Sequence, residues 1–224
     1  MNTNRGTKLW ITGPGNSDAN TGSGIYVTTS DLAVSNCEFT NLIIKNFGVD
    51  GFYGNGLITT RFSTVEVIDC ANNGFNIIDG TSLTWDGGCY ANGIAGYGYL
   101  LNGTVYSCLN GCASDGGAGG YNLESVIGVA LNGCGSESQS VFGCKINGGS
   151  NVTLASFYNR VNPGIAIWVT GDATNVVLIS PVERSPGGGA TASIQFDSGS
   201  TGVVIAPTTV TATAYNGTVN AITP

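Results

Sequence analysis

Three charged residues occupy one position of a repeated segment, and their types suit polysaccharide hydrolysis. Asp115, Glu137 and Arg160 follow one another at about one repeat each, so stacked repeats would place their backbones about 4.8 Å apart. Retaining glycosidases need carboxyl groups about 5 to 5.5 Å apart and inverting ones about 6.5 to 9.5 Å. When two carboxylates lie close together, their repulsion raises the pKa of one of them, while a neighbouring arginine keeps the other ionised. Asp115 and Glu137 are therefore the predicted catalytic pair, assisted by Arg160; the alternative is a row of solvated turn residues.

A second set of residues could bind the sugar chain itself. Asn122, Lys145, Trp168 and Gln195 alternate with apolar neighbours, which predicts an outward strip on successive strands. A tryptophan face buries the apolar side of a sugar while amide and ammonium groups bind its hydroxyls. The alternative for Trp168 is a contact between subunits. The direction of Trp85 stays open, because Gly87 and Gly88 could form a bulge that turns it inward.

Both sets depend on a repeat that begins with an apolar residue or a cysteine and continues into a turn. "DCANNGFNI" at 69 is followed by "GCYANGIAG" at 88, "GCASDGGAG" at 111 and "GCGSESQSV" at 133. The repeat predicts one column of stacked residues: Phe47, Cys70, Cys89, Cys112, Cys134, Phe157 and Pro181. Its spacing of about 19 to 24 residues matches one coil of a β-helix.

Short alternating segments lie on both sides of this column, such as "TVEVID", "NVTLAS" and "NVVLIS". A single repeat cannot bury its own apolar face, so neighbouring repeats must stack to form the core. The predicted fold is all-β, a single-stranded right-handed parallel β-helix of roughly eight to nine coils, with two strands and a turn in each. Residues 1–24 form the predicted cap and opening strand, 25–205 the β-helix, and 206–224 a Thr/Val-rich tail available for a trimer contact.

Small and polar residues after the column are predicted to form its turn. Gly51, Gly74, Gly93 and Gly116 would supply a left-handed backbone. Asp50, Asn73 and Asn92, one position earlier, would bond neighbouring backbone groups. The seven cysteines are expected to be free thiols, and the sequence implies neither a metal nor a cofactor, since it has no histidine.

Composition excludes several functions. Fourteen acidic residues against seven basic ones, a net charge of −7, argue against a nucleic-acid partner. No apolar run is long enough to insert in a membrane, and the first residues do not read as a signal peptide. We therefore expect synthesis in a cytoplasm without export.

Phrases such as "GIYVTTSDLAVSNCEFTNLIIKNF" and "NVTLASFYNRVNPGIAIWVTGDATNVVLISP" resemble the pectate-lyase-like β-helix superfamily, and within it the bacteriophage tailspikes and tail fibres. This resemblance covers roughly residues 25–205. It implies a homotrimer in the virion that recognises bacterial surface polysaccharide, contacts other virion proteins and often cleaves its glycan. Two enzyme types of the superfamily do not fit, because polygalacturonases and pectate lyases use histidine motifs that this chain lacks.

Three functions remain open at this level. The first is a phage appendage that binds a host glycan, with or without cleaving it. The second is a structural virion fibre or decoration protein without enzymatic activity, and the third a bacterial carbohydrate-active enzyme or adhesin.

Overall fold

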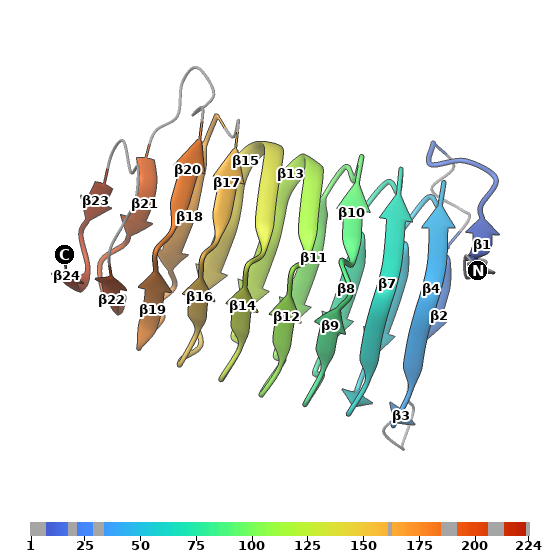
Figure 1. Cartoon of the computed structure of the whole chain (residues 1–224), viewed down its shortest axis with the longest axis horizontal. Coiled ribbons are helices and arrows are strands. Elements are labelled where there is room, and N and C mark those ends of the chain that lie inside the picture. The colour runs from blue at the N-terminus through green and yellow to red at the C-terminus, as the bar shows by residue number, and fades with distance from the viewer. Residues whose placement is uncertain are drawn as a thin grey trace, which may run out of the picture.

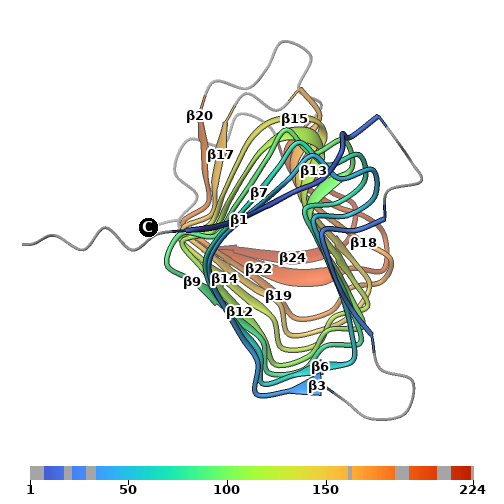
Figure 2. The same cartoon turned by 90° about the vertical axis from the view of Figure 1, so that its right-hand side faces the viewer.

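The chain winds into a right-handed parallel β-helix. The computed structural model describes residues 8–17, 22–28, 34–160, 163–184, 192–205 and 213–222. Every element in these ranges is a strand, and the strands of successive coils pair in parallel (Figure 1). Seen from the N-terminal end in Figure 2, the chain runs clockwise as it recedes, so the helix is right-handed. Within these ranges no helix is long and apolar enough to cross a membrane.

The parallel strands line three faces around a central core (Figure 2), and all of them except β3 and β6 belong to one continuous sheet. The first face contains β1 (Leu9–Thr12), the C-terminal parts of β4 (Glu38–Lys45) and β7 (Arg61–Ile68), β10 (Tyr90–Asn92), the N-terminal parts of β13 (Ala113–Glu124) and β15 (Gly135–Asn147), β17 (Tyr158–Arg160) and β20 (Val182–Arg184). The second face contains β2 (Ile25–Val27), β5 (Phe52–Asn55), β8 (Phe75–Ile78), β11 (Tyr97–Asn102), the C-terminal parts of β13 and β15, β18 (Ile165–Thr170), β21 (Ala192–Phe196) and β23 (Thr213–Tyr215).

The third face completes each coil and was not foreseen, since two strands per coil were expected. It contains the N-terminal parts of β4 and β7, β9 (Thr84–Asp86), β12 (Cys108–Asn110), β14 (Ala130–Asn132), β16 (Thr153–Ala155), β19 (Val176–Ile179), β22 (Thr201–Ile205) and β24 (Thr218–Ile222). The short strands β3 (Val34–Ser35) and β6 (Leu57–Ile58) pair at the corner between the second and third faces. Seven steps separate β1 from β20 on the first face, so the solenoid makes about seven turns there. The described strands number eight on this face and nine on each of the other two, in agreement with the expected eight to nine coils.

Apolar side chains fill the interior and stack on their counterparts in the next coil. The rings of Phe75, Tyr99 and Tyr121 lie one above another, with centroids 4.9 and 4.8 Å apart. The Tyr121 hydroxyl donates a hydrogen bond across the interior to the Cys112 carbonyl oxygen at 2.7 Å, which satisfies its polar end. Continuous stacking of this kind supplies the core that no single coil can form.

Trp85 belongs to this core and not to the surface. Its side chain is fully buried and stacks on Phe62 with ring centroids 4.8 Å apart. Gly87 and Gly88, which follow β9, both have positive φ, so the chain turns sharply only after the tryptophan.

The expected alignment of Cys70 with Cys89 is wrong, because the two cysteines lie at different corners. Cys89, Cys112 and Cys134 stack in register just before the strands of the first face. Cys70 lies after a strand of that face, and Val65 occupies the place next to Cys89. All seven cysteines of the chain are free thiols, and burial raises the pKa of Cys70 to about 11, so this thiol stays protonated at neutral pH.

Glycine has two separate roles, and the sequence reading merged them. Gly93 and Gly116 have φ of 64° and 68° and form the predicted turn after the first face. Gly51 and Gly74 lie in another column, outside the left-handed region. A Cβ at Gly51 would lie 2.0 Å from a methyl carbon of Val67, so the close approach of two faces requires glycine there.

Asp50 and Asn73 likewise separate from the column of Asp115 and instead form a buried corner network. One Asp50 carboxylate oxygen accepts hydrogen bonds from the backbone nitrogen and Nδ2 of Asn73, both at 2.9 Å. The other oxygen accepts from Nδ2 of Asn76 at 2.9 Å. The prediction that these Asn and Asp residues bond neighbouring backbone is confirmed at this corner.

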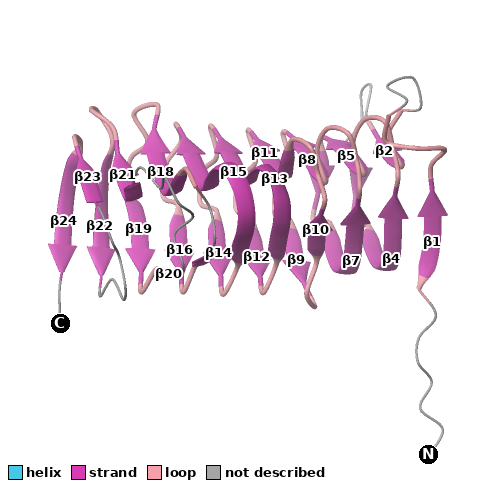
Figure 3. Cartoon of the chain, turned by 90° about the horizontal axis from the view of Figure 1, so that it is seen from above, coloured by secondary structure: helices cyan, strands magenta, loops and turns pink. Residues whose placement is uncertain are grey.

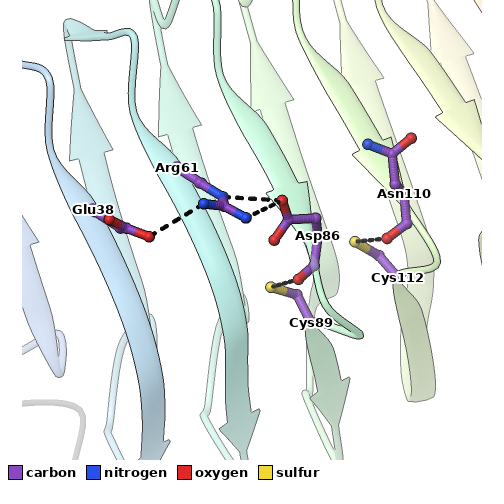
Figure 4. A network of polar contacts seen from close by, with 6 residues as sticks. All are labelled: Glu38, Arg61, Asp86, Cys89, Asn110 and Cys112. Carbon is purple, nitrogen blue, oxygen red and sulfur yellow. Dashed lines mark hydrogen bonds and ion pairs between the residues drawn. The ribbon is translucent and has the colours of Figure 1, made fainter.

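Charged residues also tie successive coils together on the outside. Arg61 lies between two acidic residues of neighbouring coils, and its guanidinium reaches Glu38 at 3.4 Å and Asp86 at 3.0 Å (Figure 4). In the same view the Cys89 thiol donates to the backbone oxygen of Asp86 at 3.3 Å. Surface pairs of this type add little stability individually, but this one joins three consecutive coils.

Strands stack across both of the expected domain boundaries. β1, before residue 25, pairs with β4, and β24, after residue 205, pairs with β22. These strands lie at opposite ends of the solenoid (Figure 3).

Candidate functional site

The three predicted catalytic residues lie side by side on the first face. Asp115 pairs in register with Glu137, and Glu137 with Arg160. Asn92 precedes this column and Arg184 follows it on β20. Neighbouring strands are about 4.8 Å apart, so the predicted alignment of Asp115, Glu137 and Arg160 on successive coils is confirmed, while their catalytic roles stay a prediction.

The two carboxylates have different partners. Arg160 Nη1 lies 2.5 Å from Glu137 Oε1, and the two side chains are 49% and 36% exposed. Asp115 Oδ2 accepts a longer hydrogen bond from the Tyr90 hydroxyl, at 3.4 Å. Burial, followed by the negative charge of Asp115, raises the pKa of the Tyr90 phenol, so it remains a hydrogen-bond donor at neutral pH.

A hollow lies beside these carboxylates, and its shape follows from side-chain size. Tyr90, Ala113, Gly135 and Tyr158 form one column, with two small residues between two tyrosines. The hollow has a volume of about 110 Å³ and opens to solvent. We call it the tyrosine notch; its lining is Tyr90, Ala113, Ser114, Asp115, Gly135, Ser136, Glu137 and Tyr158.

The notch combines features that suit a hydroxyl-rich ligand. Tyrosine rings offer apolar surface with a polar tip, while Asp115 and Glu137 accept hydrogen bonds along one side. Two carboxyl groups on adjacent coils are also the chemical requirement of a glycosidase. Among the residues that the structure places, no group of three or more Cys, Asp or Glu side chains could hold a metal ion.

The predicted binding strip is one continuous column on the second face. Asn122, Lys145, Trp168 and Gln195 pair in register across β13, β15, β18 and β21. Their exposure is uneven, however, because Asn122 is only 2% exposed whereas the other three are partly exposed. The strip lies beyond a corner from the tyrosine notch, on the C-terminal parts of β13 and β15.

Trp168 is held firmly within this strip. Its Nε1 donates a hydrogen bond to Asp197 Oδ2 at 2.8 Å, and Gln195 Nε2 donates to Asp197 Oδ1 at 2.6 Å. The Lys145 ammonium lies over the ring, 4.6 Å from its centroid. Burial alone would raise the pKa of Asp197, but hydrogen bonds from Gln195, Thr170 and Trp168 and the charge of Lys145 lower it, so the carboxylate is ionised.

Sequence reasoning missed three important residues. Tyr90 and Tyr158 became visible as a pair only once the register was known, although both stand one residue after the predicted column. Asp197 had a local signal, since Gln195 and Asp197 repeat the spacing of Asn122 and Glu124. In both pairs the amide donates to the acid two residues later.

Comparison of the chain with protein-family models and with curated proteins found no match.

Proposed function

We propose that this protein is a virion appendage of the tailspike or tail-fibre kind that recognises a bacterial surface polysaccharide through the tyrosine notch. The observation that supports this proposal is the notch itself, in which two tyrosines flank a hollow beside Asp115 and Glu137. Aromatic surface next to convergent hydrogen-bonding groups is the usual composition of a small-ligand site. The parallel β-solenoid agrees with the resemblance to pectate-lyase-like β-helices.

The decisive experiment fills the notch without disturbing the core. Gly135 lies on a strand with ordinary φ, and a Cβ there would be 3.5 Å or more from its neighbours. Gly135→Leu should therefore fold normally and abolish glycan binding, because the added side chain occupies the hollow. Binding is measured by surface plasmon resonance on a panel of purified capsular and O-antigen polysaccharides.

A matched pair of tyrosine variants gives the control. Tyr158→Ala should weaken binding about tenfold, since it removes one aromatic wall. Tyr106→Ala removes a tyrosine that is 70% exposed and lies outside the notch, so it should leave binding unchanged. Equal binding by the parent and Gly135→Leu would refute the notch as the site, and no binding to any glycan would favour a structural fibre.

A further inference from the structure

The Trp168 ring is fixed in place but is not freely available. Asp197 holds its edge through the 2.8 Å hydrogen bond, which sets the plane of the ring. Lys145 lies one coil before it in the same column and covers one face at 4.6 Å. A sugar that stacks on that face must first move the ammonium group.

An alternative partner for that ammonium exists on the other side of Lys145. Asn122 precedes Lys145 in the column, and its Oδ1 is buried without a hydrogen-bond partner. Asn122 Nδ2 donates to Glu124 Oε1 at 2.9 Å, which fixes the amide with Oδ1 as the free acceptor. A buried acceptor without a partner is costly, so a donor that reached it would be stabilised.

We propose that Lys145 is a displaceable cover of Trp168. In the free protein the ammonium lies on the ring; when a neutral sugar stacks there, the ammonium moves back one coil to Asn122 Oδ1, beside the Glu124 carboxylate. The displaced group loses its cation–π contact and its attraction to Asp197 and gains hydrogen bonds at Asn122, so uncovering the ring leaves a small net cost. Asp197 is the positioning residue that keeps the ring in place during the exchange.

This inference rests on the proposed carbohydrate recognition and adds a second contact point with a stated ligand class. Glu124 and Asp197 accept hydrogen bonds from the two ends of the strip, Asn122 and Gln195, and one cation, Lys145, lies in the strip between them. A ligand that replaces the cation on the ring and leaves both acids in place is best uncharged. Neutral hexose or N-acetylhexosamine units, which have an apolar face, fit this requirement.

The cover is tested first without any glycan. In a Trp10→Phe background the remaining tryptophans are Trp168 and the fully buried Trp85. Lys145→Ala should therefore increase acrylamide quenching of tryptophan fluorescence, because it exposes the ring of Trp168. Unchanged quenching would show that Lys145 does not cover the ring and would overturn the proposal.

The exchange is then tested with hexasaccharides of glucose and of N-acetylglucosamine at millimolar concentration. Lys145→Ala should bind at least one of them about two- to fivefold more tightly than the parent, which is the gain from removing an exposed cation–π contact. Trp168→Ala should lose this binding. Lys45→Ala is the matched control, since Lys45 covers Trp10 at 4.8 Å outside the strip and should change nothing.

Three outcomes separate this inference from the proposed function. If Lys145→Ala weakens binding as much as Trp168→Ala does, Lys145 contacts the sugar and the cover is refuted. If Trp168→Ala binds normally while Gly135→Leu does not, the notch stands and the second contact point falls. If neither hexasaccharide binds the parent or Lys145→Ala, the neutral ligand class is refuted, while the polysaccharide panel still decides the notch.

Discussion

Asp115 and Glu137 occupy equivalent positions but have unequal partners. Glu137 is paired with Arg160, whereas Asp115 accepts one longer hydrogen bond from the neutral Tyr90. A catalytic pair requires its two carboxyl groups to differ in this manner, one acting as acid and the other as base or nucleophile. The sequence already predicted that Arg160 would pair with one carboxylate, and the structure adds the hydrogen bond from Tyr90 to the other.

Loss of either carboxylate should reduce polysaccharide cleavage without affecting the folding of the protein. We expect Asp115→Asn and Glu137→Gln each to lower the rate of polysaccharide cleavage at least about a hundredfold, as for loss of an acid or base catalyst. Unfolding free energies should change by less than about 1 kcal/mol, because the ion pair of Glu137 is exposed. Reducing ends are measured on a polysaccharide that the parent degrades. Glu38→Gln, which also removes one partner of an exposed ion pair, is the control. Full activity of both Asp115→Asn and Glu137→Gln would exclude these residues as the catalytic pair.

Asp197 should make stability depend on pH in the acid range. Its pKa is lowered in the folded protein from an ordinary 3.8, so its contribution is present above 3.8 and is lost as pH falls through the lowered pKa. Asp197→Asn should therefore be less stable than the parent at pH 7, and the difference should shrink in strong acid. Urea unfolding at both pH values measures it; a difference that grows in acid would contradict the assignment.

At the scale of strands, glycine decides how closely the faces approach and where the notch is hollow. Gly120 faces inward, where a Cβ would lie 2.5 Å from both the Gly143 carbonyl oxygen and Ser136 Oγ. Gly135 on the same pair of strands faces outward into the notch, with its nearest neighbour at 3.5 Å. One glycine is therefore needed for packing, and the other leaves room for a ligand.

The same substitution at these two glycines should have opposite consequences. Gly120→Ala should lower the free energy of unfolding by about 1 to 3 kcal/mol, since the core has no space for the methyl group. Gly135→Ala should be neutral or slightly stabilising, because alanine restricts the unfolded chain and fits the folded one. Thermal and urea unfolding compare the two with the parent; equal losses would show that the outward placement of Gly135 is wrong.

On the scale of the whole molecule, charge is distributed unevenly along the third face. Its N-terminal end carries Glu38, Arg61 and Asp86, joined as one network. From β14 to β22 its outward residues carry no charge: Ala130, Asn132, Thr153, Ala155, Val177, Ile179, Val203 and Ile205. An uncharged surface on a protein of net charge −7 suits contact between copies, because it avoids repulsion.

We expect the protein to be a homotrimer with parallel axes that uses this surface. Val177→Lys should convert the trimer to a monomer, since it brings several charges together at the contact. Thr84→Lys, in the same column at the charged end, should leave the trimer intact. Sedimentation velocity at micromolar concentration reports both, and a monomeric parent would count decisively against the prediction.

The sequence by itself determined the stacking and much of the candidate site. Alternating apolar residues and a repeat of about one coil are sufficient for a parallel β-helix, because each coil can bury its apolar face only against the next. Within that repeat, equal spacing placed Asp115 beside Glu137 and aligned Trp168 with Lys145, and the structure has both alignments. The spacing of residues along the chain was sufficient to predict which residues align wherever neighbouring coils have nearly the same length.

Only the tertiary structure decided which corner each residue occupies. Cys70 and Cys89 stand in similar sequence phrases, but Cys70 follows a strand of the first face and Cys89 precedes one. The 19-residue spacing between them therefore connects two different columns, which the sequence analysis had treated as one. The sequence pattern does not distinguish three faces from two, because inward and outward residues alternate in the same way on every face. The tyrosine notch depends on that distinction, since a hollow exists only where small residues of separate coils lie between two large ones.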